Sequence, residues 1–518
     1  MKKIVLFAIG FMANVSFVFA QSEIDAVRYS TSNDLLGTAR YMSMGGAFGA
    51  LGGDISCMSG NPAGIAVFSK SEVAFSPNIN IAGVSSNRNT SDRIDENKPN
   101  FFFNNIGIVG TFNYAKRDPE VKFRNLNIGA NFSRVKSFYR NVSTVGGYSP
   151  YSLSDGIVAN SEGIPEYLMS GDNAFNSSAP WLQTLAFQSY LMDPVADVDG
   201  DGNMDSYKNN LSDGTVDHSR YESWERGYID SYDFSIAGNF DNLIRFGVGL
   251  GINSLRYETE INYDEFYVGN KSMNLSNYLK TTGYGVNLKF GLLLTPIDNL
   301  RLGLSLHTPT FYDLSDEFDA KMVAYGDTVV SSQTPIDRIA DYRLQTPLKF
   351  SVSAAYIIKS KALISAEYQF ENTSGIKLKN DKGQTSVFEY DNNMIKDHYK
   401  ATHTIRVGAE VRPIESLGIR LGFATVSSSV KNDVESSGKT IIVAGTVPHY
   451  SFEKRTYYYT AGLGYNGSIV HVDLAYVLRM NQENLYAYPT YIDNGDALVP
   501  SKLTNLTHNI VATIGFKF

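Results

Sequence analysis

The chain has 518 residues, a net charge of −8, 44 glycines, 33 tyrosines and 30 phenylalanines, but only 2 tryptophans and 1 cysteine. The acidic balance argues against nucleic acid as a partner. Cys57 stands alone, which excludes an internal disulfide and favours a buried small side chain over a reactive thiol. This aromatic- and glycine-rich composition favours strands over helices.

Residues 1–20 have the pattern of a secretory signal peptide. Lys2 and Lys3 precede an apolar run, and Val18 and Ala20 are small residues at the −3 and −1 positions, so we expect cleavage before Gln21. The alternative, a membrane anchor, is disfavoured because the run is short for a bilayer. No later stretch of 18 apolar residues predicts a transmembrane helix. The sequence therefore predicts an exported protein.

The stretch MGGAFGALGGDISCMSGNPAGI, residues 44–65, is the most glycine-rich part of the chain. It matches neither G-x-G-x-x-G nor G-x-x-x-x-G-K-[ST], no lysine follows that would reach a phosphate, and no βαβ pattern surrounds it. A nucleotide site is thus disfavoured. Small side chains allow tight turns and close packing, so residues 21–70 are predicted to form a hatch that plugs the lumen of a barrel.

From residue 71 to residue 518 apolar and polar residues alternate with period two, as expected for strands. Residues 234–240 and 244–252 form the clearest hairpin, across the turn Asp241-Asn242. Four more hairpins follow the same pattern, joining 284–294 to 300–306, 348–356 to 362–370, 405–411 to 417–423 and 457–465 to 470–478. Long polar connections separate them, at 141–225, 312–341, 371–400, 426–449 and 481–502.

Short turns that alternate with long loops are typical of outer-membrane barrels. We therefore predict an all-β fold, a transmembrane antiparallel β-barrel of about 14 strands with its aliphatic face toward lipid. The chain ends on an aromatic, Phe518, which resembles the terminal strand by which bacterial outer-membrane proteins are recognised by the barrel-assembly machinery. A secreted β-sandwich would also alternate, but it predicts neither this ending nor the long extracellular loop at 141–225.

The long loop contains DVDGDGNMD, which has the spacing of an EF-hand calcium loop. The five candidate Ca²⁺ ligands are Asp197, Asp199, Asp201, Asn203 (through its carbonyl) and Asp205. Position 12 is Lys208 instead of a bidentate Glu, so a site at 197–208 would be weak. A solvated acidic turn fits the same residues. No cofactor is otherwise required.

Nothing in the sequence indicates an enzyme. The chain has seven histidines but neither H-E-x-x-H nor G-x-S-x-G. His471 and Asp473 fall on the same inward face, but no nucleophile accompanies them. Haem binding would need an exposed axial ligand, and only His218 and His449 fall near loops.

The hatch stretch resembles that of the FadL family, outer-membrane transporters of long-chain fatty acids and other hydrophobic compounds, which include the TodX-like hydrocarbon transporters. The matching positions are Gly45, Gly46, Ala47, Asp54, Asn61, Pro62, Ala63 and Gly64. Residues 302–318 resemble a second family segment, a strand that ends in a Pro-containing stretch.

The resemblance implies a passive channel in which a hydrophobic ligand enters from outside, crosses the lumen and leaves sideways into the membrane. In the family the third strand is kinked, and Gly129 is the candidate for a kink here, with an ordinary strand glycine as the alternative. The expected setting is the outer membrane of a Gram-negative bacterium, as a monomer among outer-membrane lipids. A general porin-like channel and a surface adhesion or haem-binding barrel are the alternatives.

Overall fold

The computed structural model describes residues 23–31, 34–88, 93–116, 118, 120–198, 200–212, 215–335, 338–359, 361–436, 445–488 and 499–518. The predicted signal peptide and Asp199 lie outside these ranges. Within the ranges, none of the helices has the length and apolar character needed to cross a bilayer.

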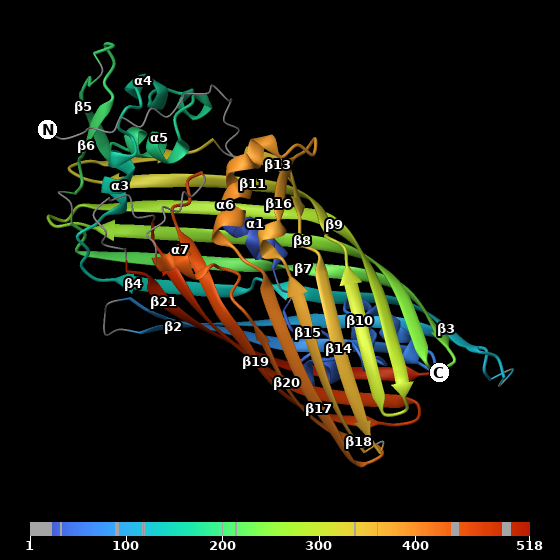
Figure 1. Cartoon of the computed structure of the whole chain (residues 1–518). Coiled ribbons are helices and arrows are strands. Elements are labelled where there is room, and N and C mark those ends of the chain that lie inside the picture. Colours follow the sequence, from blue (N-terminus) through green and yellow to red (C-terminus); the bar gives the residue numbers. More distant parts are fainter. Residues whose placement is uncertain are drawn as a thin grey trace.

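Fourteen antiparallel strand positions close into a barrel, because the first strand pairs with the last (Figure 1). This confirms the predicted fold class. Ten positions are single strands: β1 (Glu72–Asn87), β2 (Ile94–Asn113), β7 (His218–Phe240), β8 (Ile244–Phe266), β9 (Ser272–Ile297), β17 (Thr402–Ile414), β18 (Leu417–Val426), β19 (Tyr450–Asn466), β20 (Val470–Tyr486) and β21 (Ser501–Lys517).

Four positions are each divided between two consecutive strands: β3 (Phe123–Ser137) with β4 (Arg140–Gly146), β10 (Leu300–His307) with β11 (Phe311–Tyr325), β13 (Arg338–Gln345) with β14 (Lys349–Ile358), and β15 (Ala362–Glu371) with β16 (Lys377–Asn380). Pro309 and Pro347 stand at two of these breaks. Proline has no N–H for the ladder, which explains an interruption at both places. The break at Pro309 lies in the residue 302–318 segment noted above.

The two faces of the sheet differ as the alternation predicts. Phe234, Ile236, Val248 and Leu250 point outward and are 41–55% exposed, which is favourable only if the surface faces lipid. These residues and their equivalents on the other strands form an apolar belt around the short-turn half of the barrel. The inward face carries glycines and buried polar residues.

The strands run further toward the long-loop end than the alternation indicates. The predicted loop 141–225 contains all of β4 but its first residue and the first eight residues of β7. The predicted loop 312–341 contains most of β11, half of β13 and all of β12 (Val329–Gln333). Above the belt the outward side chains are polar, so the apolar/polar alternation fades although the hydrogen-bonded ladder continues. This corrects the predicted loop boundaries.

Helices and a small hairpin fill and cover the long-loop end (Figure 1). They are α3 (Leu153–Ala159), α4 (Glu166–Met169), η3 (Ala174–Asn176), α5 (Trp181–Gln188), β5 (Met192–Ala196), β6 (Ser206–Asn209), η4 (Thr373–Gly375), η5 (Ser386–Phe388), α6 (Glu389–His398) and α7 (Asn432–Ser436). Together with α1 (Glu23–Ser30) they bury one large apolar cluster, in which Trp181 packs against Phe318 of β11.

The chain then passes through the barrel before it joins the wall. Residues 34–70, which we call the hatch, contain α2 (Ala39–Ser43), η1 (Ile55–Ser59) and η2 (Pro62–Val67), and most of the hatch residues are buried. They contact inward-facing residues of most barrel strands, as the next section describes.

Candidate functional site

A ring of side-chain caps shapes the first half of the hatch. Thr38 caps α2 by accepting a hydrogen bond from Tyr41 N, and its hydroxyl donates to Asp54 Oδ2 at 2.7 Å. Asp54 caps η1 by accepting from Ser56 N at 2.9 Å, and Ser56 Oγ accepts from Thr38 N. Burial raises the pKa of the Asp54 carboxyl. These reciprocal bonds hold together the starts of α2 and η1, which are sixteen residues apart in the chain.

The side chain of Asn61 shapes the second half of the hatch, around η2. Its Oδ1 accepts from Ala63 N at 3.1 Å, which caps η2, and Pro62 occupies the first turn of that helix, where a missing N–H costs nothing. Its Nδ2 donates to Gly49 O at 2.7 Å and to Leu292 O of β9 at 3.3 Å. Asn61 therefore fixes both the helix and its position against the wall.

The predicted glycines have separate roles. Gly45 and Gly46 have φ of +63° and +76° in the turn that ends α2, a region that favours glycine. Gly64 is needed for space, because a Cβ there would lie 2.8 Å from Cys57 Cβ. Ala47 is fully buried. Burial raises the pKa of the Cys57 thiol, in agreement with its interpretation as a buried small residue.

Glycines on the inward face of the wall let the hatch lie against the strands. A Cβ at Gly422 would come within 3.0 Å of the backbone of Met44 and Gly45, and one at Gly408 would meet Met44. Gly303 faces Gly49, and Gly247 faces Pro62 in the same way. The lumen at this height is thus filled by closely packed backbone.

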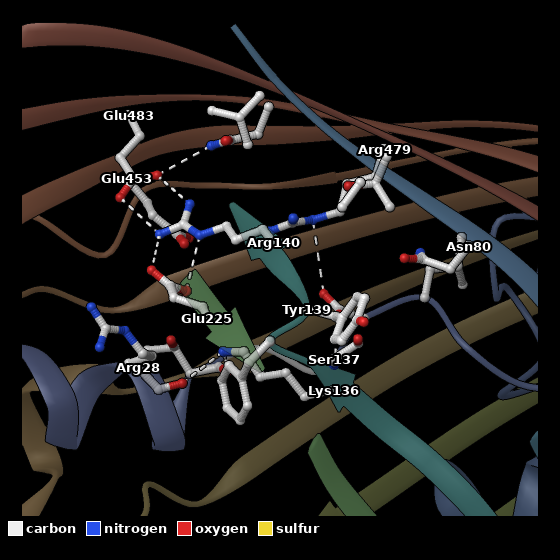
Figure 2. Close-up of a pocket in the computed structure, with 18 of the residues that line it drawn as sticks. Arg28, Asn80, Lys136, Ser137, Tyr139, Arg140, Glu225, Glu453, Arg479 and Glu483 are labelled. Carbon is white, nitrogen blue, oxygen red and sulfur yellow. Dashed lines mark hydrogen bonds and ion pairs between the residues drawn. The ribbon is translucent and has the colours of Figure 1, made fainter. Parts of the chain in front are cut away.

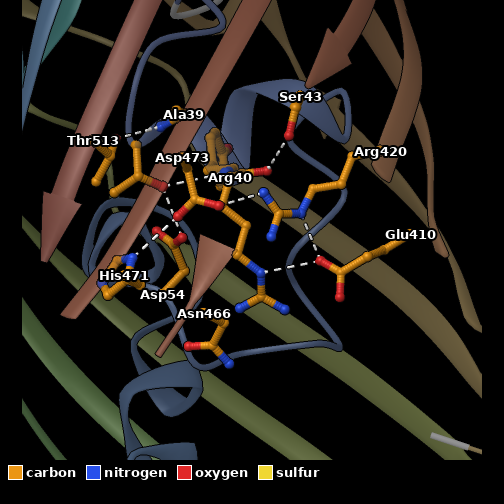
Figure 3. A network of polar contacts seen from close by, with 12 residues as sticks. Ala39, Arg40, Ser43, Asp54, Glu410, Arg420, Asn466, His471, Asp473 and Thr513 are labelled. Carbon is orange, nitrogen blue, oxygen red and sulfur yellow. Dashed lines mark hydrogen bonds and ion pairs between the residues drawn. The ribbon is translucent and has the colours of Figure 1, made fainter. Parts of the chain in front are cut away.

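A chain of ion pairs joins the hatch to four strands at the short-turn end (Figure 3). Arg40 of α2 contacts Glu410 at 3.3 Å, and Glu410 contacts Arg420 at 2.6 Å. Arg420 contacts Asp473 at 2.5 Å, and His471 bridges Asp473 and Glu72 of β1, at 3.0 and 3.1 Å. The His471–Asp473 pair expected from the sequence is formed, as part of this network.

The wall itself is interrupted on one side of the lumen. Pairing between β2 and β3 runs from Asn113–Asn125 to Asn105–Ser133, and in the described part of the chain β2 has no pairing partner on this side beyond Asn105. Past Ser137 the chain turns inward: Ser143 O of β4 accepts from Ser86 Oγ at 2.6 Å, on the inner face of β1. β2 and the β3–β4 position therefore separate within the upper part of the belt, where Phe101 and Phe103 of β2 still point outward.

The interruption does not lie at Gly129. That residue is paired on both sides, with Val109 and Ser235, and the irregularity near the break falls between Arg134 and Lys136. A Cβ at Gly129 would lie 2.6 Å from Met58 Sδ. Its small size serves hatch packing, so Gly129 fits the alternative of an ordinary strand glycine, and the break in the wall lies at residues 134–140.

A cavity of about 130 Å³ lies directly behind the interruption (Figure 2). Its walls combine apolar side chains from α1, β1 and β2 with charged groups that point inward. Arg140 forms ion pairs with Glu225 and Glu483 at 3.0 and 2.7 Å, and Arg479 approaches Asp34 at 3.8 Å. Lys136 Nζ donates to two carbonyl oxygens, Arg28 O at 2.7 Å and Thr31 O at 3.1 Å. The cavity has an apolar side and a polar side.

Sequence reasoning missed these cavity residues. Arg134, Lys136 and Arg140 are charges inside an otherwise alternating strand, and the adjacent aromatics Phe138-Tyr139 disturb the alternation. Charged groups within a spanning segment are a functional signal, and together with that disturbance they could have located the break.

The calcium prediction falls partly outside the described residues, since it includes Asp199. The remaining candidates lie in the β5–β6 hairpin, where Asp197 accepts from Gly200 N and Gly202 N, Asp201 from Asn203 N, and Asp205 from Val198 N. No cluster of three His, Cys, Asp or Glu side chains with metal-binding geometry occurs among the described residues. The calcium site stays a prediction.

The two loop histidines considered for haem are both engaged. His449 is buried between Tyr221 and Tyr263, it shares a hydrogen bond with Ala487 O, and burial lowers its pKa to about 4. His218 stacks on Phe266 and lies 2.9 Å from Asp217. His449 Nε2 has no hydrogen-bond partner among the described residues, but it is buried, and neither histidine lines the 130 Å³ cavity.

No protein-family model and no curated protein sequence matches the chain. Solved structures do match over 94% of it. A FadL homologue from Pseudomonas aeruginosa is 12% identical, with 99% of its chain covered and a TM-score of 0.53. The toluene transporter TodX from P. putida is also 12% identical, with 99% covered and a TM-score of 0.52. At this identity the comparison establishes the fold: the chain is a fourteen-stranded barrel of the kind seen in FadL homologues and TodX.

Proposed function

We propose that this protein is an outer-membrane channel for hydrophobic small molecules, with long-chain fatty acids as the ligand class and with lateral exit into the membrane. The observation that carries the proposal is the position of the cavity, which lies behind the longest stretch of wall strand without a neighbour on one side among the described residues, Ile94 to Asn104 of β2. An apolar solute that leaves here keeps its surface out of water. The hatch blocks the alternative route toward the short-turn end.

The orientation follows from the same features. The short-turn end faces the periplasm and the long-loop end faces outward, as in other outer-membrane barrels. The apolar belt supports insertion in a bilayer, and the break between β2 and β3 then lies at the level of the outer leaflet. The neighbouring structures named FadL homologue and toluene transporter support the same class of function.

Lys136 favours an acidic amphiphile over a plain hydrocarbon. In the described part of the chain its ammonium group contacts carbonyl oxygens and no carboxylate within 4 Å. A ligand carboxylate in the cavity would supply the missing counter-charge, while the acyl chain would lie against the apolar side. A hydrogen bond to a charged group contributes about 1.5–3 kcal/mol.

Binding assays on the purified protein test the proposal. Wild-type protein is expected to bind a C16 fatty acid, and Lys136→Met to bind it about 10- to 100-fold more weakly, with toluene binding unchanged. Lys122→Met, at an exposed lysine in the turn before β3, is the matched control. Failure of the wild type to bind either ligand would count against the channel, and equal loss of both ligands in Lys136→Met would count against carboxylate recognition.

Ca²⁺ at 197–208 is proposed as a stabiliser of the outer hairpin. Addition of 2 mM CaCl₂ is expected to slow proteolysis of this hairpin, and EGTA to reverse the effect, because carboxylates of the loop would share one cation. Asp197→Asn should abolish the difference. Identical cleavage with and without calcium would mean that the loop is a solvated acidic turn.

A further inference from the structure

We propose that Arg134 is the latch that holds the interruption between β2 and β3 closed. This inference rests on the proposed lateral exit and adds the residue that controls it. Arg134 is the first residue of β3 beyond the last β2–β3 pair, Asn105–Ser133. It therefore stands at the point where the two strands part.

Two aromatic rings enclose the guanidinium of Arg134. Its Cζ lies 4.7 Å from the centroid of the Phe102 ring and 4.5 Å from that of Tyr228. Phe102 belongs to β2 and lines the lumen cavity, while Tyr228 belongs to β7 and lines a groove of the outer face beside Tyr284, which is 69% exposed. The guanidinium thus stands between a ring of the cavity and a ring of the outer surface.

A bidentate ion pair fixes this position. Arg134 Nε and Nη2 donate to the two carboxylate oxygens of Asp230, at 2.9 and 3.2 Å, and the two side chains are 13% and 7% exposed. Two parallel bonds hold the plane of the guanidinium, and a planar cation can stack on rings at the same time. A lysine at this position would keep the positive charge but could not form the two parallel hydrogen bonds to Asp230.

A second, weaker bridge spans the interruption further up. Lys98 of β2 donates to Glu225 O of β7 at 3.2 Å, and its ammonium group lies 4.1 Å from the centroid of the Tyr139 ring. Only side chains hold β2 to the opposite side here, since no ladder pairing does so among the described residues. Rotation of Arg134 away from Phe102 would therefore part the wall without breaking a backbone hydrogen bond.

The chain offers a matched control on the same strand. Arg124 of β3 also pairs with an aspartate, Asp241, at 3.2 Å, but it lies at the short-turn end, next to Asn125, from which β3 is paired on both sides. Arg124→Ala removes the same charge from the same strand and leaves the interruption untouched.

The first measurement is release of a bound fatty acid. Full-length protein in lipid nanodiscs is loaded with pyrene-labelled hexadecanoic acid, and its transfer to the lipid is followed by fluorescence. Arg134→Ala is expected to accelerate release at least tenfold with probe affinity changed less than threefold. Arg134→Lys should give an intermediate rate, and Arg124→Ala the wild-type rate. Release from Arg134→Ala at the wild-type rate would overturn the latch.

The second measurement needs no ligand. Spin labels at Phe101→Cys and Tyr232→Cys, in a Cys57→Ala background, report the distance between β2 and β7 across the break. Arg134→Ala, or Arg134→Lys if the alanine variant does not fold, should lengthen and broaden this distance, and Arg124→Ala should not. A probe that never binds, combined with a lengthened distance, would reject the proposed ligand and keep the latch. An unchanged distance would reject the latch.

Discussion

The side chains of Asp54 and Asn61 each make two kinds of hydrogen bond in the hatch. Each caps a short 3₁₀ helix through one oxygen, and each uses its other polar atom to bond a residue twelve or more positions away. The hatch has little regular secondary structure. Its shape therefore depends on side-chain hydrogen bonds, among them those of the two carboxylate oxygens of Asp54 and of Oδ1 and Nδ2 of Asn61. That the two residues matter was predictable from the sequence. Which backbone groups they bond was not, because those partners depend on how the hatch folds inside the wall.

Asn61→Ala is expected to destabilise the hatch by about 1–3 kcal/mol, because it removes a helix cap and leaves buried carbonyl oxygens without their donor. Thermal unfolding and protease sensitivity of residues 34–70 measure the effect. Asn113→Ala is the control, since Asn113 accepts one bond from Lys116 N at the exposed turn. Equal stability of the two variants would contradict the prediction.

Asp391 of α6 makes the outer cap sensitive to pH. Burial, and secondarily the nearby Glu23, raise the pKa of its carboxyl to about 6, above the ordinary value near 4. The folded state then holds the proton more tightly than the unfolded state does, so the stabilisation is complete below about pH 4 and lost as the pH rises through about 6. Amide exchange in α6, corrected for the intrinsic rate, should show greater protection at pH 5 than at pH 7.5. Asp391→Asn should remove that dependence, and its persistence in the variant would assign it to another group.

At the scale of elements, the faces of the strands were easier to predict than their lengths. The outward face of each strand was predictable, because burial against lipid repeats every second residue. The glycines of the inward face were visible in the sequence, but the sequence left open whether the lumen that they face was crowded or filled with water. The structure explains these glycines, because they pack against the hatch. The lengths of β7, β8 and β9 were underestimated, because polar side chains on both faces hide a strand that continues beyond the membrane.

Gly422→Ala is expected to displace the hatch, because a Cβ there would overlap the backbone of Met44 and Gly45. Overpacking of this kind costs about 1–3 kcal/mol. Gly110→Ala is the control on β2, where a Cβ would meet nothing closer than 3.8 Å. Cleavage of the hatch by added protease should increase in the first variant and not in the second. A similar response of both variants would mean that the contact with Met44 does not limit packing.

At the scale of the molecule, the hatch and the break in the wall lie at different places in one barrel. The hatch fills the lumen toward the short-turn end with its caps, glycine contacts and ion pairs, and side chains alone bridge the break between β2 and the β3–β4 position, where the proposed lateral exit would lie. The barrel and its plug were predictable from periodicity and from the hatch motif. The position of the break was not predictable, because it depends on where β4 leaves the wall. The alternation within one strand contains no information on which strands pair with it.

Deletion of residues 23–68 is expected to open the axial route, because a fourteen-stranded barrel without its plug approaches the width of water-filled barrels. Single-channel recordings in planar bilayers should show little current through the wild type and a steady ohmic current through the deletion variant. Heat-dependent migration on gels would verify that the deleted protein still forms a barrel. A large, permanently open current in the wild type would instead favour a general porin.

β9 is much longer than is needed to cross the apolar part of a membrane. Its 26 residues extend roughly 85 Å at about 3.3 Å per residue, and even with the usual tilt this is well over twice the apolar thickness of about 25 Å. The long-loop end of the barrel therefore stands tens of ångströms above the lipid. In the proposed channel a hydrophobic ligand would cover that distance within protein, past the apolar cluster of the outer cap, before it reached the bilayer.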